Sequence, residues 1–152
     1  RARRNYLRSS LCIVLILALL PADLRLDQGS AARVSMRQAP GDNVALGKTA
    51  TQVSDFEDET GKGEAARAVD GKTDGIWRNR SVTHTLKEEN AWWQVDLQAN
   101  YNITTIDIWN RTDCCQDRLS DFDVSVSRDG DHWQSVSFTG TVDISTTVTV
   151  GL

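Results

Sequence analysis

Apolar and polar residues alternate along most of the chain after residue 43. Trp93, Val95 and Leu97 are separated by polar neighbours, and the same period of two returns in later segments. Such alternation is typical of strands that bury one face, and the segments are rich in Val, Ile, Thr and aromatic residues. The predicted strands are Trp93–Leu97, Ile106–Ile108, Phe122–Val126, Trp133–Phe138 and Ile144–Val150.

Turn residues divide these segments. Asp129, Gly130 and Asp131 stand between two predicted strands, as in a hairpin. Only Glu64–Val69 has a helical pattern, for one or two turns. Short antiparallel strands at this spacing predict an all-β domain, either a sandwich or a barrel.

The first part of the chain has a different character. Four arginines within eight residues precede an unbroken apolar run, Leu11–Leu20. Basic residues before about 7–15 apolar residues are typical of a secretory signal, whereas a membrane-spanning helix needs ~20. A buried core helix is the alternative. We expect residues 1–22 to be a signal peptide with an uncertain cleavage point, residues 23–42 a linker or pro-segment, and residues 43–152 the secreted, folded domain.

The charge balance narrows the function. The chain has a net charge of −4, and from residue 43 onward 10 basic residues face 18 acidic ones. This excess of acid argues against a nucleic-acid binder, which presents a basic surface to phosphates. The sequence contains no metalloprotease, serine hydrolase or Cys-x-x-Cys motif. His132 is more typical of a surface or core residue than of a catalytic base, so we expect no enzyme.

Export would also change the chemistry of the cysteines. Cys12 lies in the presumed signal, which leaves Cys114 and Cys115, adjacent in sequence, in an oxidising compartment. Neighbouring Cα atoms lie about 3.8 Å apart, closer than is usual across a disulfide, so a bond between them would shape the surface and close almost no loop. Pairing elsewhere is the alternative. Three glycosylation triplets fit a secreted glycoprotein: Asn79, Asn102 and Asn110.

One constellation of side chains stands out. It consists of His84, Arg111, Asp113, Cys114, Cys115 and Arg118. The spacing, with 26 residues between the histidine and the first arginine, resembles the fucose-binding motif of the F-type lectins (fucolectins). Segments beginning at Asn43, Ala68 and Trp92 resemble this family as well. The resemblance implies a β-jelly-roll sandwich of the discoidin type.

The residue types suit a neutral sugar. Guanidinium groups carry rigid sets of N–H donors, so Arg111 and Arg118 fit adjacent hydroxyls and the ring oxygen. His84 fits an axial hydroxyl through one ring nitrogen. Asp113 would hold a guanidinium in place. The alternative is a structural network of arginine and aspartate at the surface.

The resemblance implies further contacts with L-fucose. A disulfide between Cys114 and Cys115 would offer an apolar edge to the ring carbons. Trp77 matches the aromatic position of a pocket for the 6-deoxy methyl group, and we expect Phe56 to join it. Such a pocket discriminates by only about 1–3 kcal/mol, so the hydroxyls must carry much of the specificity.

The resemblance also implies a structural Ca²⁺ ion, which needs about six to eight oxygen ligands. Asp70 matches a side-chain ligand, Arg67 and Lys72 match positions that bind through backbone carbonyls, and Ser81 matches a further ligand. The family's C-terminal Cys-Glu pair has no counterpart before Leu152. We therefore expect an incomplete calcium site and a truncated C-terminus, and a simple turn at Asp70 is the alternative.

Together these features predict a secreted, calcium-associated lectin that binds L-fucose on fucosylated glycans, with a role in innate immune recognition. We expect no nucleic-acid partner and no membrane insertion of the mature chain, and a homo-oligomer stays open. Two alternatives remain. One is a discoidin-type adhesion module for another glycan or phospholipid, and the other is a carbohydrate-binding module detached from a glycosidase.

Overall fold

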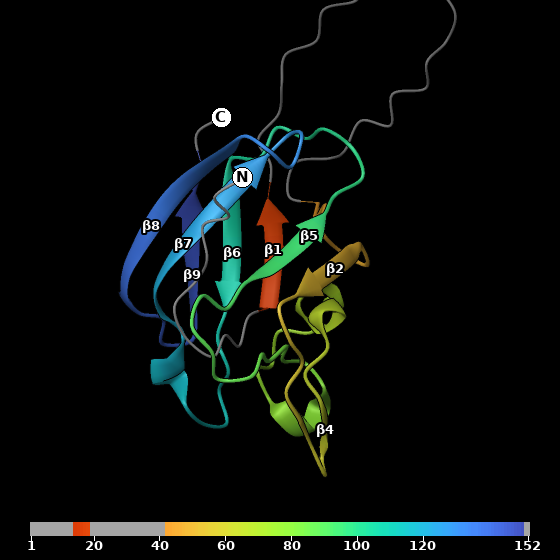
Figure 1. The fold of residues 1–152 in the computed structure, drawn as a ribbon, viewed down its shortest axis with the longest axis vertical. Coiled ribbons are helices and arrows are strands. Elements are labelled where there is room, and N and C mark those ends of the chain that lie inside the picture. Colours follow the sequence, from red (N-terminus) through yellow and green to blue (C-terminus); the bar gives the residue numbers. More distant parts are fainter. Residues whose placement is uncertain (1–13, 19–41, 151–152) are drawn as a thin grey trace, which may run out of the picture.

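Strands and short 3₁₀ helices make up the fold (Figure 1). The computed structural model describes residues 14–18 and 42–150. In this part of the chain the strands are β1 (Val14–Ala18), β2 (Thr49–Gln52), β3 (Glu57–Asp58), β4 (Gly61–Lys62), β5 (Trp93–Asp96), β6 (Thr105–Trp109), β7 (Ser120–Ser127), β8 (Trp133–Thr141) and β9 (Ser145–Thr149). The 3₁₀ helices are η1 (Ala65–Val69), η2 (Trp77–Asn79) and η3 (Gln116–Arg118).

The strands pair antiparallel in four groups. The largest sheet has the order β1-β6-β9, and β2 pairs with β5, β3 with β4, and β7 with β8. Figure 1 shows the three groups of longer strands beside one another, with the β3–β4 hairpin and most of the loops below them. The fold is therefore all-β, as the alternation predicted.

The predicted strands are confirmed in position. Along β6, Ile106 and Ile108 are buried while their neighbours are partly exposed, which is the period of two that the sequence shows. The hairpin predicted at Asp129–Asp131 joins β7 to β8. Gly130 has φ +78° there, a conformation that favours glycine.

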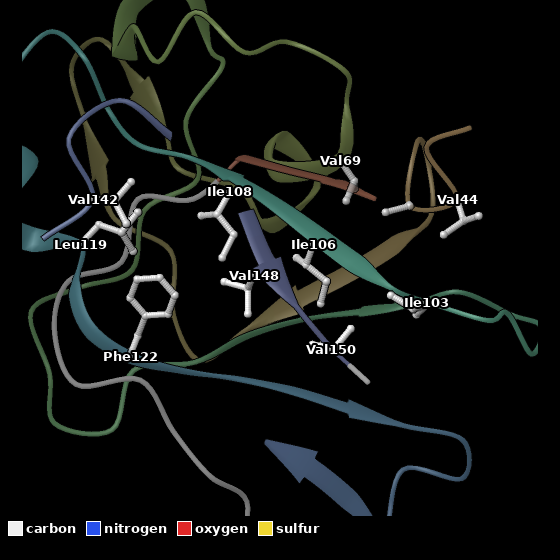
Figure 2. Packing of buried hydrophobic residues seen from close by; sticks show 11 residues of the cluster. Val44, Val69, Ile103, Ile106, Ile108, Leu119, Phe122, Val142, Val148 and Val150 are labelled. Atoms are coloured by element: carbon white, nitrogen blue, oxygen red, sulfur yellow. The ribbon is translucent and has the colours of Figure 1, made fainter. Parts of the chain in front are cut away.

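The core lies between the sheets and is almost entirely aliphatic. Phe122 adds an aromatic ring and stacks on Phe138, with the ring centroids 4.8 Å apart. Figure 2 shows these side chains converging from β6, β7, β9 and the flanking loops. We call this set the sandwich core: Val44, Ala45, Val69, Ile103, Ile106, Ile108, Leu119, Phe122, Val142, Val148 and Val150.

Two sequence predictions change in detail. The short helix expected at Glu64–Val69 is a five-residue 3₁₀ helix, η1, a form that occurs mostly in short pieces. The β3–β4 hairpin was not predicted, since two-residue strands leave no readable alternation. Within the described residues, no helix is long and apolar enough to cross a bilayer.

The N-terminal apolar run also enters the fold. Residues 14–18 form β1 and pair in register with all five residues of β6. The rest of the segment predicted as a signal peptide lies outside the described residues, as do residues 23–41 and Cys12.

The buried side chain of Asn110 rules out one predicted glycosylation site. Its Nδ2 donates hydrogen bonds to the carbonyls of Gln116 (2.9 Å) and Val142 (2.6 Å), and only 1% of the residue is exposed. A glycan could not reach this nitrogen in the folded chain. Asn79 and Asn102 are exposed.

Candidate functional site

Backbone hydrogen bonds place Phe56 and His84 side by side. The N–H of Phe56 donates to the carbonyl of His84 (2.8 Å), and the N–H of His84 donates to the carbonyl of Gly63 (3.1 Å). The chain leaves no room for a side chain at Gly63, because an added Cβ would lie 2.6 Å from His84 Cβ. Gln52 Nε2 also donates to Gly63 (2.7 Å), which ties this corner to β2.

His84 is held as a neutral acceptor. Its Nδ1 lies 2.5 Å from the carbonyl of Thr85, which can only accept, so Nδ1 carries the proton. Nε2 is then free of a proton and faces Arg118 Nη1 at 3.3 Å. Burial lowers the pKa of His84, and the positive charges of Arg118 and Arg111 lower it further against the opposing bond to Thr85. At neutral pH this ring accepts hydrogen bonds at Nε2.

Arg111 is oriented by Asp113. Its Nε and Nη2 both donate to the carboxylate, and the Asp113 carboxylate also accepts the backbone N–H of Trp77 (3.1 Å). Burial raises the pKa of Asp113, but these hydrogen bonds outweigh it and hold the pKa below its ordinary value. The carboxylate engages one side of a guanidinium that carries several N–H donors. The pair therefore presents a fixed fork of donors.

Aromatic rings form the wall of the site. The ring centroid of Phe56 lies 4.6 Å from that of His84 and 5.8 Å from that of Trp77. Trp77 is buried, and its ring lies 5.6 Å from the guanidinium carbon of Arg111. The two arginines, the histidine and the two apolar rings thus face one small region.

Trp77 is fixed by partners that sequence reasoning missed. Its indole N–H donates to Thr60 Oγ1 (2.6 Å) and lies 3.3 Å from Asp58 Oδ1, both in the β3–β4 hairpin. The guanidinium carbon of Arg67 lies 5.2 Å from the Trp77 ring. Such contacts leave no signal in the sequence, because the hairpin and Trp77 are far apart along the chain.

Cys114 and Cys115 form a disulfide with a Cα–Cα distance of 3.8 Å. Both residues are half-buried. Cys115 adopts φ 63°, which is uncommon for a residue other than glycine. Its carbonyl accepts the N–H of Arg118 (3.1 Å), so the bridge sits between the two arginines of the site.

The two side chains expected to bind calcium, Ser81 and Asp70, are hydrogen-bonded within the chain. The Ser81 hydroxyl is fully buried, donates to Asp74 and accepts the N–H of Ile76 (3.0 Å). Asp70 Oδ1 accepts the N–H of Lys72 (2.9 Å), and the Lys72 ammonium lies 3.8 Å from Asp70 Oδ2. Among the described residues, no group of three or more His, Cys, Asp or Glu side chains could hold a metal ion.

Residues 67–152 match the family model described as a NedA-like, galactose-binding domain of the F5/8 type C group. The chain is 38% identical over 88 residues to Fucolectin of Anguilla anguilla and 42% identical over 80 residues to Fucolectin-3 of Anguilla japonica. The chain belongs to the F-type lectin (fucolectin) family. These two alignments cover 57% and 52% of this F-type lectin, which spans about half the length of the relatives (56% and 44%).

Solved structures show the same fold. The lectin binding domain of Lectinolysin, a histidine mutant complexed with Lewis b, superimposes with a TM-score of 0.67 at 35% identity. That match covers 75% of this F-type lectin and 80% of the other chain. A Streptococcus pneumoniae fucose binding module gives a TM-score of 0.64 at 32% identity, covering 70% and 74%. Fucolectins are lectins, so the family is one of sugar-binding proteins and not of enzymes.

Proposed function

We propose that this F-type lectin binds L-fucose on fucosylated glycans at the region shared by His84, Arg111 and Arg118. The observation that carries the proposal is the convergence of one fixed acceptor and two guanidinium groups on an aromatic wall. In this proposal a sugar hydroxyl replaces Arg118 Nη1 as the donor to His84 Nε2, and the arginines donate to neighbouring oxygens. One of the matched structures is complexed with Lewis b and another is a fucose binding module, which supports the choice of sugar.

The apolar side of the sugar has matching surfaces in the proposal. Phe56 and Trp77 line the place for the 6-deoxy methyl group. The Cys114–Cys115 bridge contacts the ring carbons. Asp113 does not contact the sugar in this arrangement, and positions Arg111 instead.

The acidic hairpin disfavours the phospholipid alternative. Glu57, Asp58 and Glu59 are exposed at the tip of β3–β4, next to the proposed site. Anionic lipid surfaces attract basic segments and repel acidic ones. A neutral glycan meets no such repulsion.

The direct test is a titration with L-fucose and a glycan array. We expect binding to fucosylated glycans that free L-fucose competes away. Arg118→Ala should reduce the affinity at least about tenfold, because a charge-assisted hydrogen bond contributes roughly 1.5–3 kcal/mol. The matched control is Arg128→Ala, which removes an exposed arginine at the far end of β7. Equal affinity of both variants and the unchanged chain would contradict the proposed site.

We further propose that the chain is exported with residues 1–22 as a signal and acts in innate immune recognition. A relative from striped bass serum supports an extracellular location (TM-score 0.52, 30% identity, covering 70% of this chain and 42% of that chain). Removal of residues 1–22 would take β1 away from β6. N-terminal sequencing of the protein from culture medium tests this. We expect an end after residue 22, and an end before Val14 would show that β1 is retained.

A further inference from the structure

One carboxylate closes the loop that leads into the site. Asp74 Oδ1 accepts the N–H of Ile76 (2.8 Å) and the hydroxyl of Ser81, and Oδ2 accepts Asn79 Nδ2 (2.9 Å). These hydrogen bonds lower the pKa of Asp74, so the group is charged at neutral pH. The Asp74 side chain therefore connects residues before, within and after η2 by hydrogen bonds.

The same loop is bonded directly to the arginine segment. Thr112 Oγ1 donates to the carbonyl of Asp74 (2.7 Å), and the N–H of Thr112 donates to the carbonyl of Gly75 (2.8 Å). Trp77 lies two residues after Gly75, and its N–H donates to Asp113, which in turn accepts hydrogen bonds from Arg111. The position of the Asp74 loop thus determines the position of the donors.

The contact between the two segments is close. An added Cβ at Gly75 would lie 2.5 Å from the carbonyl oxygen of Asn110 and 2.8 Å from Thr112 Cγ2. Gly75 also has φ +68°, which favours glycine. The loop therefore has little freedom to shift without moving the segment that carries Arg111.

A cation at Asp70 is the competing way to order this loop. The hydroxyl of Ser81 is already used by Asp74 and Ile76. Asp70 bonds within its own turn and lies near the ammonium of Lys72, which is also 3.5 Å from the carbonyl of Asn79. The chain's own groups thus already bond to the Ser81 hydroxyl and to Asp70 Oδ1, the two side-chain oxygens expected to hold the ion.

We infer that Asp74 is a positioning residue for Arg111 and that its carboxylate orders the loop beside the sugar site. The inference rests on the proposed fucose binding. Asp74 touches no sugar in this arrangement and acts through Thr112 and Trp77.

The experiment compares two aspartates of the same loop. Asp74→Ala, Asp74→Asn and the matched control Asp70→Ala are titrated with L-fucose, and the unchanged chain is titrated with excess EDTA and with excess CaCl₂. We expect Asp74→Ala to weaken binding about tenfold or more, since charged hydrogen bonds are lost. Asp74→Asn keeps one oxygen acceptor and should fall in between. Asp70→Ala, EDTA and CaCl₂ should change the affinity less than about twofold.

Two results would overturn the inference. One is a loss of binding with Asp70→Ala or EDTA as large as that with Asp74→Ala, which would assign the ordering to a cation. The other is full affinity in a folded Asp74→Ala chain. If that variant does not fold, Asp74→Asn and Thr112→Val carry the same comparison.

A second measurement separates positioning from general loss of stability. The NMR signal of the Arg111 Nε–H reports on its bond to Asp113. We expect it to shift in Asp74→Ala and in Thr112→Val, and the double variant to add little, because both act through one connection. No shift in either variant overturns the inference. This signal needs no sugar, so it still tests Asp74 if the unchanged chain fails to bind fucose, an outcome that would overturn the proposed function alone.

Discussion

The sandwich core and the site end of this F-type lectin are stabilised in different ways. In the sandwich core, mostly aliphatic side chains from β6, β7, β9, η1 and the flanking loops pack against one another. At the site end, the apolar cluster consists of Trp77 and Val82 with Phe56 against it, and buried polar residues surround it. Those buried polar residues are Arg67, Ser81, Thr83, His84 and Thr85.

This difference separates stability from recognition. Apolar burial is non-directional, so the core depends on close packing and not on the direction of any one contact. Hydrogen bonds at the site end have fixed directions, and a buried polar group that loses its partner is costly. We therefore expect changes in the core to affect mainly unfolding, and changes at the site end to affect mainly sugar affinity.

The largest effect should come from the core. Ile108 is 2% exposed, and Ile108→Ala should lower the free energy of unfolding by about 2–5 kcal/mol, through lost burial and the cavity left behind. Urea unfolding measures this, and the fucose affinity of the folded fraction should hold. The control is Ile144→Ala, at a residue that is 60% exposed, with a change within about 0.5 kcal/mol. Similar losses in both variants would break the comparison.

A methyl group at the site end should act on affinity. Gly63→Ala puts a Cβ 2.7 Å from the backbone nitrogen of His84, so the histidine must move. We expect the fucose affinity to fall about tenfold, or about 1.4 kcal/mol, by calorimetry. Gly130→Ala has open space around its Cβ but a positive φ, so it should cost about 1–2 kcal/mol of stability and leave affinity intact. Unchanged binding in Gly63→Ala would show that His84 need not be held in place.

Acid should weaken binding through His84. Its lowered pKa keeps the ring neutral at pH 7, and protonation at lower pH removes the acceptor and adds charge beside Arg118. Affinity should therefore be constant above about pH 6.5 and fall several-fold below it, in the range of the lowered pKa. The unfolded chain binds this proton more readily, so the free energy of unfolding also decreases as the pH falls through the same range.

The chain offers a control for this pH profile. It has two histidines, and His132 lies on the exposed β7–β8 hairpin with its pKa raised by Asp129. His132→Gln should keep the acid loss of fucose affinity, whereas His84→Gln should bind more weakly with a flat profile. A pH dependence that follows His132 would be the contrary outcome.

The smallest effect on stability should come from the disulfide. A bond between Cys114 and Cys115 closes almost no loop, so the unfolded chain gains little freedom when it is broken. Cys114→Ser with Cys115→Ser should shift the melting temperature by less than about 2 °C but weaken fucose binding a few-fold. Calorimetry and thermal melts measure the two quantities. A large drop in melting temperature with full affinity would show that the disulfide contributes to stability and not to sugar recognition.

Local patterns in the sequence determined the strands and the residue types of the site. The spacing of Ile106 and Ile108 predicts β6, because side chains alternate between the two faces of any strand. The spacing of the residues from His84 to Arg118 resembles the fucose-binding motif of the F-type lectins, and a spacing can be compared without a structure. The roles of Asp74, Thr60 and Gly63 could not be predicted, because each acts on residues distant along the chain.

The sequence by itself therefore determined an all-β chain with two arginines and a histidine suited to a sugar, since periodicity and side-chain chemistry are local properties. Only the tertiary structure decided that Thr112 bonds to the carbonyl of Asp74, and that Asn110 is buried. It also decided that the Arg118 guanidinium meets Nε2 of His84. Hydrogen bonds have direction and short range, so which donor meets which acceptor depends on how distant segments pack.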